Sequence, residues 1–391
     1  MVLEFKPVAL SATQRKKAEK LGINITSMAE ADRYYGGPEL KCLALEYLLC
    51  SNVFLLSRFY HLFGEEKNGK STLAVDWLNR YFLEPGGSAM LAETENKLNT
   101  ELFRKMLGDN YSRLDVSREP VLEKTTATIT EFTKALVNNN RKRIMQLAAV
   151  DVDSLRVLSG ETVDKTQQEG APTRNYAIEA GKWRTFLGSY MPLIQDMPIA
   201  LIGVNHAREE AVEGTSIKTL GCGGGKAIKF YESYRILVKT TKRVEQVKNS
   251  RAVLQLTTKS NTNGPVGRKI YPEIVYRSDG DSSRVYVDWD AADAELLSTD
   301  DGNRILRSKL YDEGVCAVKA SSEKGLYNDE ILGLKKVPIQ EITAALYADS
   351  DRLAKFREIE QIAVYKNLEQ LYEAGWFFDA KKLGKSDDEE E

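Results

Sequence analysis

Residues 64–71 read Gly-Glu-Glu-Lys-Asn-Gly-Lys-Ser, the G-x-x-x-x-G-K-[ST] pattern of a phosphate-binding loop. A strand-like apolar run precedes this loop at 59–63, and residues with helical spacing follow it over 73–82. In that context the loop turns backbone N–H groups towards an anion, and the helix adds its positive N-terminal end. The alternative is an ordinary glycine-containing turn before a helix. The sequence therefore predicts a nucleoside triphosphate site.

Individual positions of the loop have predicted roles. Lys70 would reach the β- and γ-phosphates, and the hydroxyl of Ser71 would bind Mg²⁺. The predicted nucleotide contacts in this segment are Gly64, Glu65, Glu66, Lys67, Asn68, Gly69, Lys70, Ser71 and Thr72.

Composition narrows the classes of protein. The 391 residues, 42% of them hydrophobic, suit a core of ordinary size with smaller appendages. No apolar run approaches the ~18 residues of a membrane span, and Glu4 and Lys6 interrupt the apolar start, which argues against a signal peptide. We therefore expect a cytoplasmic protein without membrane contact. Four cysteines without metal-ligand spacing and only two histidines argue against a metal site built from these residues.

The charges balance over the chain but not along it. There are 55 basic and 57 acidic residues, for a net charge of −2, which does not suggest a wholly basic surface. The terminus 385–391 reads Lys-Ser-Asp-Asp-Glu-Glu-Glu, and we expect an acidic, disordered tail there.

Alternating patterns predict an α/β fold. From 41 to 280, short apolar runs alternate with helical stretches, which is typical of a mostly parallel, twisted sheet flanked by helices. A Gly-Gly-Pro break at 36–38 separates a partly helical segment, 1–40, from this core, and mixed signals over 281–384 predict a small α+β C-terminal domain. The predicted strands are 59–63, 88–92, 144–152, 199–205, 234–240, 253–258 and 273–278.

Three strand ends carry polar residues suited to triphosphate chemistry. We assign the Mg²⁺ role to Asp153, with Asp151 as the alternative, although a strand-end cap would give the same pattern. Glu95, after the strand at 88–92, is the candidate for polarising an attacking water, against the alternative of an exposed acidic turn. His206 closes the strand at 199–205 and would contact the γ-phosphate, unless it is a structural histidine.

Two long polar stretches interrupt the predicted core. They cover 159–175 and 208–225, and the second ends in a glycine cluster. Both are long for connections inside a compact α/β core, so we expect functional loops.

These segments together resemble the RecA family of homologous-recombination ATPases, in particular its phage, UvsX-like branch. The likeness rests on the phosphate loop with Glu66 inside it, on Glu93-Thr94-Glu95, and on Val152-Asp153-Ser154. The most specific segment is Val204-Asn205-His206 followed by Gly-Gly-Lys-Ala-Ile-Lys-Phe-Tyr-Glu-Ser-Tyr-Arg at 224–235. The likeness covers about 41–280, and histidine at 206 is similar to the phage version.

The resemblance implies a RecA-like ATPase core that uses ATP and Mg²⁺ and forms filaments on single-stranded DNA. It implies two DNA-binding loops, at 158–175 and 207–225. Single-stranded DNA requires cations for its phosphates and small residues where backbone N–H groups approach them. The implied DNA contacts are Arg174, Lys182, Arg184, Arg208, Lys218, Gly224 and Gly225.

The resemblance also implies that ATP lies between protomers. Lys259 is similar to one of two cations that the family supplies from the neighbouring protomer, whereas the second position holds the neutral Asn261. Lys229 and Phe230 would lie at the subunit interface, and 1–40 would dock on the adjacent protomer. The residue stacking on adenine would be Phe103, with Leu102 as the alternative.

The leading hypothesis is a DNA-dependent ATPase that pairs single-stranded DNA with a homologous duplex, helped by a loading mediator and a single-strand-binding protein. A ring-forming replicative helicase on the same core is one alternative, which the Gly-Gly-Lys-Ala-Ile-Lys-Phe-Tyr pattern disfavours. An ATP-binding filament or mediator protein that hardly hydrolyses ATP is another, and Asn261 favours it.

Overall fold

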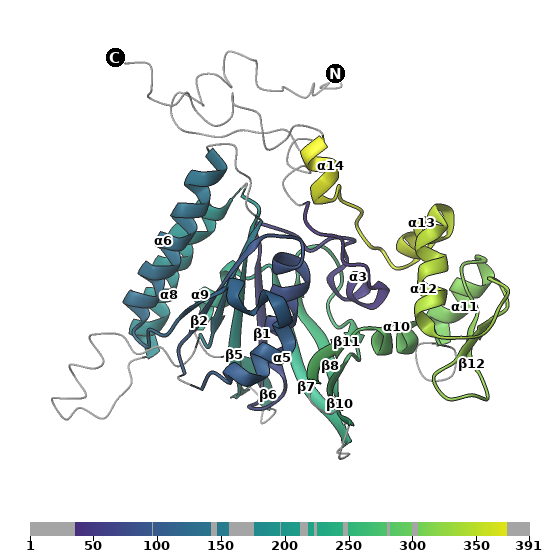
Figure 1. Ribbon diagram of the computed structural model, residues 1–391. Helices are drawn as coiled ribbons and strands as arrows, with labels where there is room; N and C mark the ends of the chain where they lie inside the picture. The colour runs from purple at the N-terminus through teal and green to yellow at the C-terminus, as the bar shows by residue number, and fades with distance from the viewer. Residues whose placement is uncertain are drawn as a thin grey trace, which may run out of the picture.

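One large twisted sheet forms the centre of the chain (Figure 1). The computed structural model describes residues 36–95, 97–141, 147–155, 176–195, 197–211, 218–222, 225–244, 249–279, 282–298 and 304–373. The strand order is β11-β10-β8-β7-β1-β5-β4-β2-β3, and β6 and β9 pair with β5 and β8. The strands are β1 (Phe59–Gly64), β2 (Ser88–Glu93), β3 (Leu114–Ser117), β4 (Ala148–Asp153), β5 (Ile199–Ala211), β6 (Lys218–Cys222), β7 (Tyr234–Val244), β8 (Asn249–Asn261), β9 (Lys269–Ile270), β10 (Glu273–Asp279) and β11 (Ser282–Asp288).

The sheet is parallel at its centre and antiparallel on one side. Strands β7, β1, β5, β4, β2 and β3 run parallel, whereas β8, β10 and β11 are antiparallel to their neighbours. All seven predicted strands are present. The predicted class, an α/β protein with a mostly parallel sheet flanked by helices, is confirmed. Because the central strands are parallel, their carboxyl ends meet at one edge of the sheet.

Helices cover both faces of this sheet. They are α3 (Leu43–Leu49), α4 (Lys70–Leu78), α5 (Thr100–Leu107), α6 (Leu122–Arg141), α8 (Tyr176–Ile194), α9 (Gly225–Tyr231) and α10 (Asp290–Leu297), with a π-helical turn η2 (Asn79–Leu83) and a 3₁₀ turn η3 (Gly108–Arg113). In β1, Phe59 packs with α6, α8 and α9, whereas Tyr60 and Leu62 pack with α3 and α4 on the other face. The period-2 alternation of a strand thus places a separate apolar core on each face.

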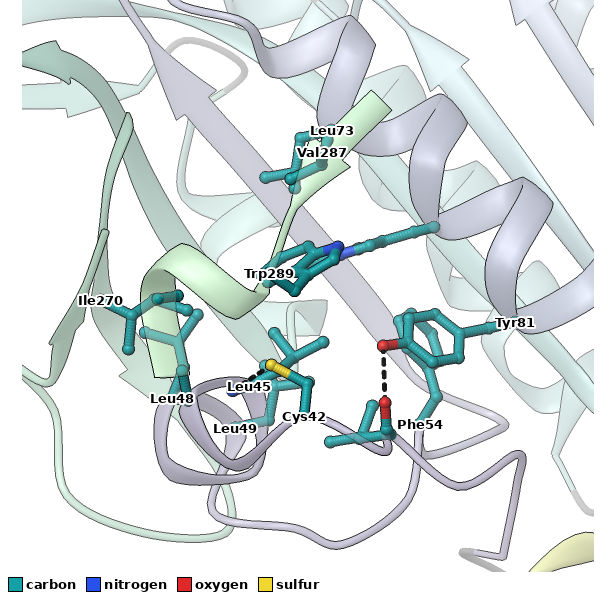
Figure 2. Packing of buried hydrophobic residues seen from close by; sticks show 14 of the residues in the cluster. Cys42, Leu45, Leu48, Leu49, Phe54, Leu73, Tyr81, Ile270, Val287 and Trp289 are labelled. Carbon is teal, nitrogen blue, oxygen red and sulfur yellow. Dashed lines mark hydrogen bonds between the residues drawn. The ribbon is translucent and has the colours of Figure 1, made fainter. Parts of the chain in front are cut away.

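The larger core lies on the α3 and α4 side. Figure 2 shows side chains of α3 gathered with Phe54, Tyr81 and Trp289 in one cluster. Two of its polar groups are paired: Tyr81 donates a hydrogen bond to Leu40 O at 3.1 Å, and Trp289 Nε1 donates to the buried Asp76 at 2.9 Å. Paired polar groups of this kind fix the packing of a core without leaving a donor unsatisfied.

A small α+β unit follows the sheet, as predicted for the C-terminal part. It contains α11 (Arg304–Asp312), β12 (Val318–Ala320), β13 (Tyr327–Asp329), β14 (Leu334–Val337), α12 (Ile339–Ala348) and α13 (Ser350–Ile359). The chain then returns to the core, where Leu368 N, at the start of α14 (Leu368–Glu373), donates a hydrogen bond to Gly37 O at 3.1 Å. Arg357 of α13 makes two hydrogen bonds, of 2.8 and 2.9 Å, to the buried carboxylate of Glu46 in α3, and Tyr347 donates a third at 2.9 Å. This buried ion pair ties the unit to the core.

The chain joins and leaves the core at different points from those we expected. In the antiparallel pairing of β10 with β11, Glu273 lies opposite Asp288 and Asp279 lies opposite Ser282. The domain boundary that we expected at 280 therefore falls between two paired strands. The sheet therefore continues to Asp288. At the other end, Pro38 O accepts a hydrogen bond from Phe54 N at 2.8 Å, so the chain is part of the core from the Gly-Gly-Pro break onwards. Residues 1–35 and the tail at 385–391 lie outside the described residues.

Candidate nucleotide-binding site

The phosphate loop joins the central strand β1 to α4, as predicted. Gly64 ends β1, and a Cβ atom there would lie 2.2 Å from the carbonyl oxygen of Val238 in the neighbouring strand. Only glycine fits that approach. Lys67 and Gly69 both have positive φ angles, of 59° and 79°, which turn the loop back over the start of α4. The first backbone N–H groups of α4 therefore end at the loop, where they can bind phosphate oxygens.

Lys70 lies inside the loop. Its side chain is buried, and Nζ donates a hydrogen bond to Glu65 O at 2.6 Å. Burial lowers the pKa of Lys70, and the nearby carboxylates of Asp153 and Glu95 oppose that shift. A cation held in this way is ready to exchange a carbonyl partner for a phosphate oxygen.

The two predicted Mg²⁺ ligands meet beside the loop. Asp153 ends β4, and its carboxylate lies near enough to Ser71, the second residue of α4, for that hydroxyl to favour the ionised form of Asp153 and so oppose the rise in its pKa. Burial raises the pKa of Asp153. A hydroxyl and a single carboxylate match the way proteins hold Mg²⁺, which keeps several waters and takes other ligands from phosphates. The residues present therefore fit Mg²⁺ with a triphosphate.

Asp151, the alternative ligand, lies deeper on the same face of β4. It is fully buried, and neither carboxylate oxygen has a hydrogen-bond partner in the part of the chain that the structure describes. Burial raises its pKa well above the ordinary value, with the charge of Asp153 adding to the effect. Asp153, not Asp151, is the carboxylate that reaches Ser71.

Glu95 and His206 meet at the same edge of the sheet. Glu95 Oε1 lies 2.6 Å from His206 Nε2, and Glu95 Oε2 lies 3.3 Å from Lys97 Nζ. The hydrogen bond with His206 is the main reason that the pKa of Glu95 is lowered to about 2. The carboxylate is therefore ionised and held by two neighbours, a state in which it can accept a hydrogen bond from water.

A short buried network fixes the segment that carries Glu95. Glu93 Oε1 accepts hydrogen bonds from the backbone N–H groups of Glu95 and Lys97, both at 3.0 Å. Thr94 Oγ1 donates to Ser154 O at 3.0 Å and accepts from Ser154 N at 2.9 Å, which joins the ends of β2 and β4. The backbone N–H groups of the predicted water-polarising residue and of Lys97 are thus both held by Glu93.

One pocket of about 550 Å³ is lined by Lys70, Ser71, Glu95, Lys97, Asp153 and His206. Strand β7 and the two strands beyond it, β8 and β10, form its far wall, which the sequence did not predict. Arg243 of β7 closes part of it, since Nη2 donates to Lys67 O at 2.9 Å. Further wall residues are Thr240, Val244, Ser250, Arg251, Ala252, Ile274 and Tyr276. The ring of Tyr276 is 40% exposed and belongs to the pocket.

The predicted adenine-stacking residue lies elsewhere. Phe103 is buried in the larger core, and neither it nor Leu102 lines the pocket. Phe103 and Leu107 are four residues apart, so α5 turns both side chains inward on one face. The exposed aromatic residue at the pocket is Tyr276, in β10. The sequence pattern of this strand did not indicate that one of its faces borders a site.

The implied DNA-binding residues are only partly placed. Arg174 and Gly224 lie outside the described residues, and Gly225 begins α9. Lys182 of α8 pairs with Glu123 of α6, and Arg184 is exposed. Where we expected an irregular loop after 207, β5 and β6 form a hairpin that pairs Arg208 with Gly221 and Lys218 with Ala211. The sequence missed this hairpin because its polar residues masked the strand pattern.

The implied interface residues lie away from the pocket of their own chain. Phe230 is 80% exposed on α9, next to Lys229. Lys259 is exposed near the end of β8, opposite the end that borders the pocket. Asn261 Nδ2 donates to Leu48 O at 3.4 Å and to Cys50 Sγ at 3.2 Å. Its amide is thus engaged within its own chain.

Comparison with curated proteins finds distant similarity to RecA proteins. The protein RecA of Mycoplasma genitalium is 25% identical over 210 residues, which is 53% of this chain and 56% of that protein. Protein RecA of Bacillus subtilis is 27% identical over 241 residues (60% and 63%), and that of Chlorobaculum parvum is 27% identical over 223 residues (56% and 57%). The chain thus matches less than two thirds of the length of these relatives. No protein-family model matches.

The fold agrees with that similarity, since the large, mostly parallel sheet flanked by helices is a RecA-like core. None of the helices that the structure describes is both long and apolar enough to cross a membrane.

Proposed function

We propose that the chain is a DNA-dependent ATPase and strand-exchange recombinase of the RecA type, which forms filaments on single-stranded DNA and pairs it with a homologous duplex. The observation that carries the proposal is the meeting of Lys70, Glu95 and His206 in one pocket. They come from separate segments of the chain, namely the start of α4, the turn after β2 and strand β5. The Glu95–His206 contact joins residues 111 positions apart.

The proposed chemistry assigns each group one task. Lys70 and the N–H groups at the start of α4 bind the phosphates, and Ser71 and Asp153 hold Mg²⁺. Bound Mg²⁺ neutralises charge on the phosphates. Glu95 orients a water for in-line attack, and catalysis is then mostly positioning and electrostatic stabilisation.

His206 would connect the pocket to the DNA. It lies in β5 before the hairpin to β6, which contains Arg208 and Lys218. A γ-phosphate that interacts with the Glu95–His206 pair would change the position of His206. This change would be passed along β5, the strand that leads into the hairpin. The bound nucleotide and the affinity for DNA would then be coupled through β5, as in other switches that respond to a γ-phosphate.

The test is phosphate release with and without single-stranded DNA, for the parent chain and for Lys70→Ala. We expect stimulation by DNA in the parent and no release above background in the variant. Electron microscopy of the same mixture with ATP should show helical filaments. Closed rings with unwinding activity would contradict the proposal and favour a helicase.

One observation favours a second candidate, an ATP-binding filament or mediator protein with little hydrolysis. Asn261 is neutral, and its amide already bonds to Leu48 O and Cys50 Sγ. It therefore adds no cation to a neighbouring site. Nucleotide binding without DNA-stimulated release would favour this candidate.

A further inference from the structure

We propose that Lys97 binds the terminal phosphate of a triphosphate held by its own chain, and that this contact releases one oxygen of Glu95 for the attacking water. The inference rests on the proposed function and adds to it a cation that distinguishes triphosphate from diphosphate.

The position of Lys97 supports this role. It lines the pocket together with Lys70, Asp153 and His206. Its side chain is 71% exposed, and Nζ lies 3.3 Å from Glu95 Oε2. An exposed lysine paired with one carboxylate gains little from that pair, so exchanging the partner costs little.

The main chain beneath this side chain is fixed. Lys97 N donates to Glu93 Oε1 at 3.0 Å, and Glu93 is buried. Glu93 is paired with Asp153 in the register of β2 and β4. The exposed ammonium group of Lys97 can therefore move from Glu95 Oε2 to a phosphate oxygen on the same side of the pocket. The backbone N–H of Lys97 keeps its hydrogen bond to Glu93 during this movement.

The charges around Lys97 favour the exchange. Its charged neighbours are the carboxylates of Glu95, Glu66 and Asp153. A triphosphate brings several negative charges into the pocket, and a phosphate oxygen competes well with one carboxylate for an ammonium group. Once Lys97 has moved, Glu95 stays anchored through Oε1 by His206 at 2.6 Å, and Oε2 is free to accept a hydrogen bond.

Three of the other pocket cations are engaged with groups other than Glu95. Lys70 donates to Glu65 O, Arg243 to Lys67 O, and Arg251 to Glu273 at 3.2 Å. Lys97 is the lysine that contacts the proposed water-orienting carboxylate. Its removal should therefore affect recognition of the third phosphate more than that of the first two.

The experiment compares the affinities for ATPγS and ADP, each with Mg²⁺, in the parent, Lys97→Met and Lys97→Arg. Methionine keeps a long flexible stem and removes the charge, and arginine keeps the charge. We expect Lys97→Met to weaken ATPγS binding about tenfold and ADP binding less than about twofold. Lys97→Arg should stay within about threefold of the parent for both.

Lys134→Met is the matched control. Lys134 also forms a solvent-exposed pair, at 2.9 Å from Glu131, but lies on α6 and outside the pocket. It should leave both affinities unchanged.

The outcomes separate this inference from the proposed function. A parent that binds neither nucleotide overturns both. A parent that binds both, with an unchanged ATPγS-to-ADP affinity ratio in Lys97→Met, overturns the inference alone, even if kcat falls, because Lys97 would then serve only to hold Glu95.

Discussion

Glu95 Oε1 and His206 Nε2 lie 2.6 Å apart, although their residues are separated by 111 positions in the chain. The contact joins the turn after β2 to strand β5, directly beside the phosphate loop. The sequence predicts a role at the triphosphate for each residue separately, and the fold brings the two together.

Replacing Glu95 by glutamine should abolish hydrolysis and spare binding. The amide keeps the size of the side chain and can still bond to His206, but it loses the negative charge that orients water. We expect phosphate release to fall about 100-fold or more, with ATP affinity within a few-fold of the parent. An active Glu95→Gln chain would show that another group polarises the water.

Tyr276 should contribute to binding of the base. Its exposed ring belongs to the pocket wall, and stacking of a base on an aromatic ring contributes about 1–3 kcal/mol. We expect Tyr276→Ala to weaken ATP binding about tenfold and Tyr276→Phe to leave it nearly unchanged. Binding of inorganic tripolyphosphate, which has no base, serves as the control. Equal weakening of both ligands would contradict a stacking role.

Gly64→Ala should destabilise the fold. The added Cβ atom would lie 2.2 Å from Val238 O, and backbone on both sides must shift to relieve this overlap. We expect a loss of about 1–3 kcal/mol or more in urea unfolding. Gly181→Ala is the control, because Gly181 lies inside α8 with nothing within 4 Å of the added atom. Alanine there should stabilise the chain by about 0.5–1 kcal/mol.

Removing the partner of Glu46 should have a large effect. Glu46 is buried, and Arg357 supplies two of its hydrogen bonds. Arg357→Met would leave this carboxylate without its cation, at a cost of about 3–5 kcal/mol in chemical unfolding. Arg352→Met is the control, because it removes an ion pair whose side chains, Arg352 and Asp349, are 32% and 41% exposed. We expect this variant to change the free energy of unfolding by less than about 1 kcal/mol. Similar effects of both substitutions would argue against a buried anchor.

Asp293 should make stability depend on pH. Its carboxyl group is fully buried and accepts a hydrogen bond from Ala44 N at 2.7 Å, and burial raises its pKa from 3.8 to about 7. Between these values the folded chain holds a proton that the unfolded chain releases, so stability should fall as pH rises from about 4 to 7. The difference in pKa sets an upper bound of about 4 kcal/mol.

Asp293→Asn tests this prediction, since asparagine stays neutral and keeps the accepting oxygen. The variant should be more stable than the parent at pH 8, and the gain should disappear towards pH 4. Urea unfolding at both pH values measures the difference. A gain that is constant with pH would mean that Asp293 is not the titrating group.

Sequence reasoning was strongest where the signal is local. Short apolar runs predicted β1 and its neighbours, and the glycine spacing predicted the loop from Gly64 to Lys70. The parallel order then brings strand ends together, which is why Asp153 meets Ser71 and Glu95 meets His206. The roles assigned to these residues stay predictions until they are tested.

Sequence reasoning failed where position depends on packing between distant segments. Arg243 and Tyr276 reach the pocket because β7 pairs with β1 and is followed in the sheet by β8 and β10, and no local pattern specifies that arrangement. Phe103 was misplaced because its helical register, shared with Leu107, turns it into the core. Lys97 follows no strand signal and reaches the pocket through the turn that Glu93 fixes.

The placement of Lys259 has a kinetic consequence. It lies seven residues beyond Ala252, the last β8 residue at the pocket, which is roughly 23 Å along an extended strand. No lysine side chain covers that distance, so Lys259 can assist hydrolysis only in a different copy of the chain. The rate of ATP hydrolysis per chain would then rise with protein concentration. In mixtures of parent and Lys259→Ala chains, the rate would fall by more than the fraction of variant chains added.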